Sequence, residues 1–263
     1  MNILVTGGMR ILGSSLLNIL SKKYNKKNIY FLDRNKNKKR KYPLNIDKFK
    51  SISGNFNNYN EVYNIIKSKK IDVVFHLGAV TQVIDAYKSP INTFNTNIKG
   101  TINICESIRK IDKEILFIYS SSDKAYGSMT KKEYFENDRL HGDFPYDVSK
   151  SASDLIVQSY SKTYNLKVGI IRSGNIFGPG DFNLDRLVPG VIVNSIKNKK
   201  TYVRSNGKLS RDYVYVDDVA RGYSLLLEKM RKDKKRLFIY NIGSKTNLTV
   251  IQMINKILFV LKK

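Results

Sequence analysis

The feature that most constrains the fold of this chain is a glycine-rich turn between an apolar strand and an apolar helix. The predicted strand covers Asn2–Val5 and the predicted helix covers Ile11–Leu20. A turn of this kind points backbone N–H groups and a helix N-terminus at a bound pyrophosphate. The alternative is a plain tight turn with no ligand. We expect dinucleotide binding, with the site lined by Gly7, Arg10, Ile11, Leu12 and Gly13.

An acidic residue at the end of the next strand indicates which dinucleotide binds. The second predicted strand is Asn28–Leu32, and Asp33 follows it directly. A carboxylate at this position accepts hydrogen bonds from the ribose hydroxyls of the adenosine and repels a 2′-phosphate. Arg34 could accommodate that phosphate, yet the pattern as a whole favours NAD over NADP. A basic loop is predicted over Arg34–Lys41.

Strands and helices alternate along most of the chain, which predicts an α/β fold with a doubly wound parallel Rossmann sheet. Further strands are expected at 51–53, 72–77, 115–121 and 167–172, and helices at 59–69, 91–110 and 147–164. The later part is more irregular, with helices expected at 185–197 and 217–229 and extended segments at 201–203, 212–216 and 238–242. We expect an NAD-binding domain over residues 1–173 and a smaller substrate-binding portion over 174–263, interleaved with the sheet.

Composition narrows the classes of function. One cysteine, Cys105, excludes an intrachain disulfide and a cysteine-based zinc cluster, and two histidines exclude a histidine-rich metal site, so no metal is predicted. The net charge of +25 suggests nucleic-acid binding, but the lysines are scattered, and we favour a generally basic surface that steers anionic substrates. No run approaches the roughly 20 apolar residues of a membrane span, and no signal peptide is evident, so a cytoplasmic enzyme is expected.

A tyrosine and a lysine at helical spacing form the candidate catalytic pair. Tyr146 and Lys150 are four residues apart and therefore share one helix face. A lysine cation next to a phenol favours the phenolate, so we expect a lowered pKa and a general base at Tyr146. The pair follows the fifth predicted strand, whose end carries Ser122. On an arbitrary helix the same spacing would have no function.

Together these motifs resemble the extended short-chain dehydrogenase/reductase family, the NAD-dependent epimerases and dehydratases of nucleotide sugars. The resemblance covers nearly the whole chain, from about Asn2 to Asn247. It implies that the strand-end residues Leu77, Gly78 and Ala79 line the cofactor site. It further implies that three polar residues hold the sugar nucleotide: Asn175, Arg186 and Arg211.

The residues after the catalytic serine favour one branch of that family. Ser122-Asp123-Lys124 resembles the CDP-glucose 4,6-dehydratase branch. The resemblance implies that Tyr146 takes the C4 hydroxyl proton while Ser122 hydrogen-bonds that hydroxyl. Asp123 would protonate the C6 leaving group, and Lys124 would remove the C5 hydrogen or stabilise the enolate as a cation. The alternatives are a nucleotide-sugar 4-epimerase, which needs no such acid and base, and a weakly active or inactive nucleotide-binding protein.

Three departures from the family pattern carry expectations of their own. Arg10 replaces the second glycine of the turn, and we expect its side chain to obstruct the pyrophosphate; the alternatives are that it swings out or contacts phosphate itself. Gly78 stands where alanine is usual, a mild change. The chain ends at Lys263, earlier than family members do, so a truncated substrate-binding portion is expected.

The resemblance also implies a homodimer formed through the helices Ile91–Lys110 and Asp147–Tyr164.

Overall fold

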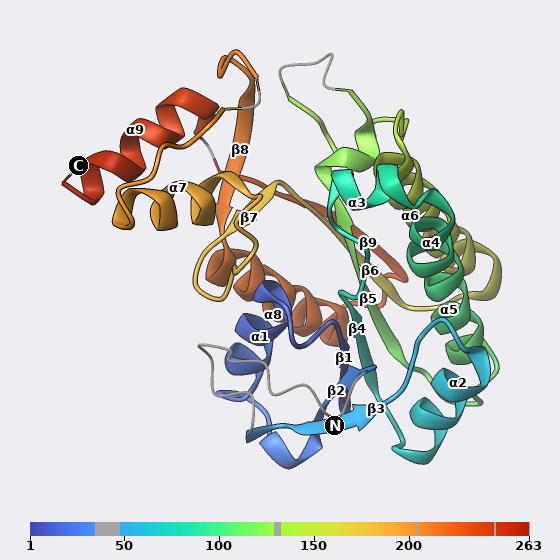
Figure 1. The fold of residues 1–263 in the computed structure, drawn as a ribbon. Helices are drawn as coiled ribbons and strands as arrows, with labels where there is room; N and C mark the ends of the chain where they lie inside the picture. The colour runs from blue at the N-terminus through green and yellow to red at the C-terminus, as the bar shows by residue number, and fades with distance from the viewer. Residues whose placement is uncertain (35–47, 129–132, 204, 245, 263) are drawn as a thin grey trace.

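The computed structural model describes residues 1–263 except 35–47, 129–132, 204, 245 and 263. The predicted basic loop lies almost entirely outside the described residues. The main element is a seven-stranded, wholly parallel sheet of order β3-β2-β1-β4-β5-β6-β9 (Figure 1). Its strands are β1 Ile3–Thr6, β2 Ile29–Asp33, β3 Lys50–Ser53, β4 Val73–His76, β5 Leu116–Ser122, β6 Val168–Ser173 and β9 Leu237–Ile242. The predicted doubly wound fold is thereby confirmed.

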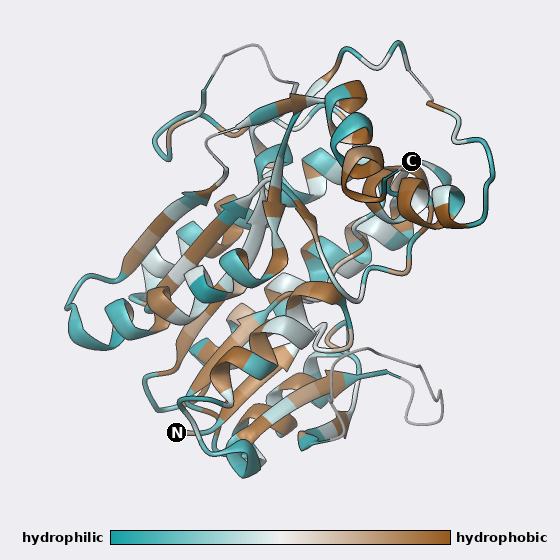
Figure 2. Ribbon diagram, turned by 90° about the vertical axis from the view of Figure 1, so that its left-hand side faces the viewer, coloured by the Kyte–Doolittle hydropathy of each residue, from teal (hydrophilic) through white to brown (hydrophobic). Residues whose placement is uncertain are grey.

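Helices cover both faces of this sheet. One face carries α1 and α8, and the other carries α2, α5 and α6 (Figure 1). Their bounds are α1 Ile11–Leu20, α2 Tyr59–Ser68, α5 Gly100–Arg109, α6 Pro145–Tyr164 and α8 Val216–Lys232. Successive side chains of β1 alternate between the two layers: Ile3 and Val5 pack toward α1 and α8, and Leu4 packs toward the opposite layer. Brown, apolar segments accordingly concentrate on the strands and on the inner sides of the helices (Figure 2).

A smaller unit projects beyond the carboxyl ends of the strands. It is a three-stranded mixed sheet of order β10-β8-β7, with β7 Asn175–Phe177, β8 Ser210–Tyr215 and β10 Asn247–Thr249. The helices α7 (Leu187–Ile196) and α9 (Val250–Val260) pack against each other beside it around Val191, Met253 and Ile257. The chain leaves this unit to form α8 and β9 on the main sheet, so one segment contributes to both parts of the fold.

Several elements differ from their prediction. The helix expected at 91–110 consists of α4 (Pro90–Phe94), a π-helical turn at Asn95–Lys99, and α5. The wider turn contains Asn97, whose side chain is hydrogen-bonded to the backbone N–H and carbonyl of Val80 and to the Ser149 hydroxyl. This side chain therefore does not face solvent. The expected strand at 201–203 is not one, because no neighbouring strand pairs with it among the described residues. A short helix not expected from the sequence, α3 (Val83–Lys88), lies beside the cleft described next.

Candidate functional site

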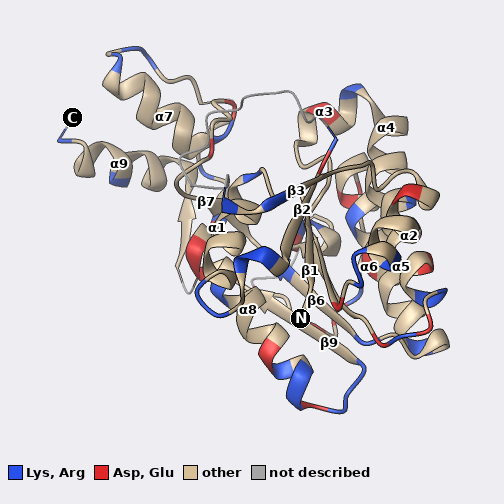
Figure 3. Cartoon of the chain, turned by 90° about the horizontal axis from the view of Figure 1, so that it is seen from below, with Lys and Arg blue, Asp and Glu red and all other residues tan. Residues whose placement is uncertain are grey.

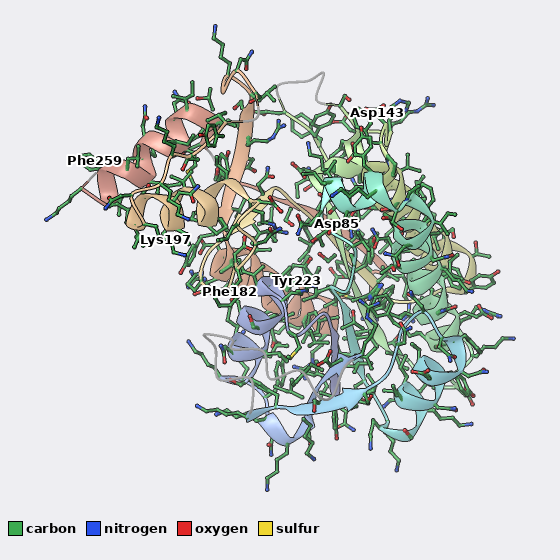
Figure 4. The ribbon with its side chains drawn as sticks, in the orientation of Figure 1. Asp85, Asp143, Phe182, Lys197, Tyr223 and Phe259 are labelled. Atoms are coloured by element: carbon green, nitrogen blue, oxygen red, sulfur yellow. The ribbon has the colours of Figure 1, made fainter. Side chains whose placement is uncertain are left out.

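A cleft of about 990 Å³ lies at the carboxyl ends of the main-sheet strands. Its walls come from the β1–α1 turn, the ends of β4, β5 and β6, the start of α6, and the loop that precedes α7. Ligands of open α/β sheets bind at this edge, where connections leave the sheet in opposite directions. Phe182, labelled in Figure 4, projects from the α7 side, and α3 with Asp85 lies on the other side.

The glycine turn forms one end of the cleft with very little spare room. Gly7 has φ +70°, and an added Cβ there would lie 2.9 Å from the Gly78 nitrogen. At Gly13 an added Cβ would lie 2.3 Å from the Gly7 carbonyl oxygen. These glycines therefore permit the tight turn and the close approach of α1 that a dinucleotide site requires. Ile11 and Leu12 line the cleft beside them.

Arg10 occupies this turn without backbone strain. It is the N-cap of α1, with φ −103° and ψ 168°, a conformation open to any residue. Its side chain is exposed and lines the cleft at the N-terminus of the helix. The substitution of the second family glycine therefore acts only through the arginine side chain, next to the place expected for the pyrophosphate.

The remaining predicted cofactor residues divide into two sets. Leu77 and Ala79 line the cleft as expected, whereas Asp33 and Gly78 are not among the residues that line it. Asp33 ends β2, and its carbonyl accepts from Gly54 N at 3.0 Å. Gly78 donates its N–H to Thr6 Oγ1 at 3.0 Å, which fastens the β4 end to the glycine turn. These contacts hold the loops around the expected adenosine position.

The five predicted catalytic residues all line the cleft: Ser122, Asp123, Lys124, Tyr146 and Lys150. Ser122 ends β5, and its hydroxyl donates to Asp123 Oδ1 at 2.9 Å and accepts from Lys124 N at 3.2 Å. Asp123 and Lys124 begin a 3₁₀ turn, η4 (Asp123–Tyr126). Burial raises the pKa of the Asp123 carboxyl above its usual value, and the Lys124 cation acts in the opposite direction. A carboxyl with a raised pKa next to the serine is better suited to donating a proton than an ordinary aspartate.

The expected lowering of the Tyr146 pKa is wrong for this structure. Burial raises the pKa of the phenol to about 12. The Lys150 ammonium is directed at the Ser120 carbonyl and at Tyr119 Oη, 3.2 Å away. Burial also lowers the pKa of Lys150 to about 8. Helical spacing thus places both groups in the cleft, but desolvation outweighs the Ser122 hydrogen bond and the Arg186 charge, which act to lower the pKa of the phenol.

The predicted sugar-nucleotide residues also line the cleft. Asn175 Nδ2 donates to the Asp212 carbonyl at 3.4 Å. Arg186 pairs with Asp181 at 3.2 Å, and its second nitrogen lies 3.4 Å from Thr81 Oγ1 across the cleft. Arg211 makes no ion pair with Asp212 among the described residues, because that carboxylate accepts from Ser244 N and Oγ instead. The Arg211 guanidinium donates from Nη1 to the Ser210 carbonyl at 3.0 Å, and the residue lines the cleft.

Several cleft residues were not predicted from the sequence. Thr81, Asp181, Phe182 and Tyr213 line the cleft from loops and from β8; the last three lie within segments that resemble the family, but no role is predicted for them. Ser121 also belongs to the lining, and its hydroxyl is buried with no hydrogen-bond partner among the described residues. An orphaned hydroxyl on the wall, together with the glycine cradle, fits a polar cofactor such as NAD. The run of three serines was the available signal.

The remaining candidates are the two kinds of site that the composition disfavours, a metal site and a membrane span, and the buried His76. His76 is buried, with Nδ1 2.7 Å from Thr6 Oγ1 and Nε2 3.2 Å from Thr101 Oγ1. Within the described ranges, no cluster of histidine, cysteine and acidic residues could hold a metal ion, and no helix is both long and apolar enough to cross a membrane. Lysine and arginine are spread over several helices and loops, interspersed with acidic residues (Figure 3).

Comparison with known proteins identifies the relatives of this arrangement. A family model described as the NAD dependent epimerase/dehydratase family matches residues 3–243. The chain is 32% identical to a dTDP-D-glucose 4,6-dehydratase of Dictyostelium discoideum, over 97% of this chain and 61% of that relative. Solved structures cover 100% of the chain, among them the following two. One is a dTDP-glucose 4,6-dehydratase of Bacillus anthracis in complex with NAD (TM-score 0.85, 26% identity, 82% of that structure covered). The other is a UDP-glucose 4-epimerase of Thermotoga maritima with UDP-glucose (TM-score 0.86, 25% identity, 83% covered).

Proposed function

Because the chain belongs to the NAD-dependent epimerase/dehydratase family, we propose that it dehydrates a nucleoside-diphosphate hexose to a 4-keto-6-deoxy sugar nucleotide. The observation that carries the proposal is the convergence of Ser122, Asp123, Lys124 and Tyr146 on one cleft. A 4-epimerase needs only the serine and the tyrosine. The acid–lysine pair beside them supplies the extra proton transfers that elimination requires.

The cofactor, when bound, accepts hydride from the sugar and later returns it. Tyr146 takes the proton of the C4 hydroxyl, and Ser122 orients that hydroxyl. Asp123 gives a proton to the departing C6 hydroxyl, a role that its raised pKa favours. The Tyr146 phenol is protonated at neutral pH in the ligand-free cleft, so we propose that it ionises only when binding brings positive charge near it.

Lys124 has two candidate roles, which one substitution separates. It is either the base that removes the C5 hydrogen or a cation that stabilises the resulting enolate. Asp123 and Asp147 both lie within its electrostatic reach, since the Lys124 charge acts to lower the pKa of each carboxyl. Lys124→Arg keeps the positive charge but removes a usable base, so it abolishes elimination in the first case and largely preserves it in the second.

The experiment that tests the function uses deuterated water. The protein is incubated with NAD and with CDP-, dTDP- and UDP-glucose, and products are analysed by mass and by NMR. A dehydratase product has lost one water and carries deuterium at C5, because the C5 proton returns from an exchanging side chain. In Lys124→Ala, NADH should accumulate, with turnover reduced about a hundred- to ten-thousand-fold. A product of unchanged mass without deuterium at C5 would replace the dehydratase assignment with the 4-epimerase.

The nucleotide base of the substrate is a separate proposal. The Ser122-Asp123-Lys124 sequence resembles the CDP-glucose branch, whereas the relatives reported above act on dTDP- and UDP-sugars. Arg186 and Arg211 contact phosphate rather than base in our proposal, so they accommodate all three nucleotides. A weakly active binding protein is the remaining alternative. Purified protein that carries no NAD and binds none would favour it.

A further inference from the structure

The turn η4 is exposed to the cleft at one end and buried at the other. Asp123 and Lys124 line the cleft, whereas Ala125 and Tyr126 are 0% and 5% exposed. The Ala125 carbonyl accepts hydrogen bonds from Ser151 Oγ at 2.8 Å and from His141 N at 3.0 Å. The rear of the turn is therefore fastened directly to α6, the helix that carries Tyr146 and Lys150.

A second fastening runs through the Tyr126 hydroxyl. It accepts from Arg172 Nη1 at 2.8 Å and donates to Asn241 Oδ1 at 2.8 Å. Arg172 belongs to β6 and Asn241 to β9, so the hydroxyl ties η4 to two neighbouring strands. The Arg172 guanidinium also stacks on the Tyr126 ring, 5.0 Å from its centroid. None of these three residues lines the cleft.

The guanidinium that holds Tyr126 is itself held by α6. Arg172 Nε and Nη2 donate to the two oxygens of Asp154 at 2.9 and 3.0 Å, and both side chains are at most 1% exposed. A buried, bidentate pair allows one arrangement, because any departure from it leaves an uncompensated charge. The path Asp154–Arg172–Tyr126 therefore fixes the distance between α6 and η4.

We propose that Tyr126 is a positioning residue. Its hydroxyl, hydrogen-bonded to Arg172 and Asn241, fixes the position of Asp123 and Lys124 relative to Tyr146. The inference rests on the proposed dehydration, since Asp123 and Lys124 act only in elimination. The first hydride transfer depends on Tyr146 and Ser122, which belong to α6 and β5, rather than on residues of η4 itself. Loss of the Tyr126 hydroxyl therefore slows elimination more than it slows hydride transfer.

The test is Tyr126→Phe, which keeps the ring and removes only the hydroxyl. We expect NADH to accumulate on the variant during turnover, kcat to fall about ten- to a hundred-fold as for a misplacement of about 1 Å, and KM to change little. The matched control is Tyr24→Phe. It removes a hydroxyl that donates to Glu228 between α1 and α8, away from the cleft, and should leave kcat and the NADH signal unchanged.

Two outcomes would overturn the positioning role. One is unchanged kcat without NADH accumulation. The other is equal slowing of both steps. Hydrogen exchange of residues 122–127 is read in parallel, and it should be faster in Tyr126→Phe than in the wild type and in Tyr24→Phe. If the wild type releases no water from any sugar nucleotide, the proposed function fails, and the exchange measurement alone then decides whether Tyr126 fixes η4.

Discussion

Restoring the usual family residue at Gly78 should destabilise this protein. The Gly78 backbone has no positive φ, so alanine meets no conformational barrier there, and only space matters. An added Cβ would lie 2.6 Å from Phe56 Cε1 and 3.0 Å from Thr6 Oγ1. The Phe56 ring cannot retreat, because it also abuts Gly100 and stands edge-on to His76 at 5.1 Å. Overpacking of this kind costs about 1–3 kcal/mol.

The assay is urea unfolding of Gly78→Ala, with thermal melting as a second measure at roughly 2–4 °C of Tm per kcal/mol. Gly222→Ala is the matched control, because its new Cβ meets only the mobile end of Ile242 and gains up to about 1 kcal/mol of helix propensity. In a double-mutant cycle, Phe56→Leu should rescue part of the Gly78→Ala loss. If Gly78→Ala is as stable as the wild type, or the cycle shows no coupling, the steric reasoning is refuted.

Four further predictions follow from other residues. Arg10→Gly should tighten NAD binding in a calorimetric titration if the side chain obstructs the pyrophosphate, and weaker binding would show that the guanidinium contacts phosphate instead. Asp33 should make NAD bind more tightly than NADP, and equal affinities would contradict its assigned role. Ile102 on α5 and Leu155 on α6 are apolar yet 36% and 52% exposed, as expected for residues of a dimer interface. Light scattering should therefore give the mass of a dimer for the wild type and of a monomer for Leu155→Glu. A monomeric wild type would count against this. Burial lowers the pKa of His76 from 6.5 to about 3, so below pH 6.5 the unfolded state binds a proton that the folded state does not. The free energy of unfolding should therefore fall as the pH drops, by at most about 1.4 kcal/mol per pH unit. His76→Gln should lack this component between pH 6.5 and 5, and a pH dependence identical to that of the wild type would refute the reasoning.

The order of strands and helices could be predicted because its signals are local. The glycine turn, the apolar strand runs and the helical periodicity each lie within about twenty residues, and the seven-stranded sheet agrees with them. The π-helical turn at Asn95–Lys99 could not be predicted in this way. It accompanies contacts of Asn97 with Val80 and Ser149, which depend on the packing of three separate elements.

The same distinction applies to the cleft. Its catalytic residues are marked by short motifs. The fold brings Ser122 and Tyr146 together because Ser122 ends β5 and Tyr146 lies at the start of α6, and both elements border the cleft. The Tyr146 pKa could not be judged, because it depends on burial by side chains from distant segments. The pairing of Arg172 with Asp154 was missed for a similar reason: its partners belong to different elements, and no spacing rule connects a strand residue to a helix residue.

The packing of α1 against α8 has a consequence for how the protein is made. The two helices share one face of the sheet, and Ser15 donates to Asp217 although 202 positions separate them. Because synthesis runs from the N-terminus, a ribosome delivers α1 well before α8. During that interval Leu16 and Leu17, both wholly buried in the finished protein, lack much of their cover. The nascent chain therefore exposes an apolar surface until α8 has been made, which is the state that chaperones recognise.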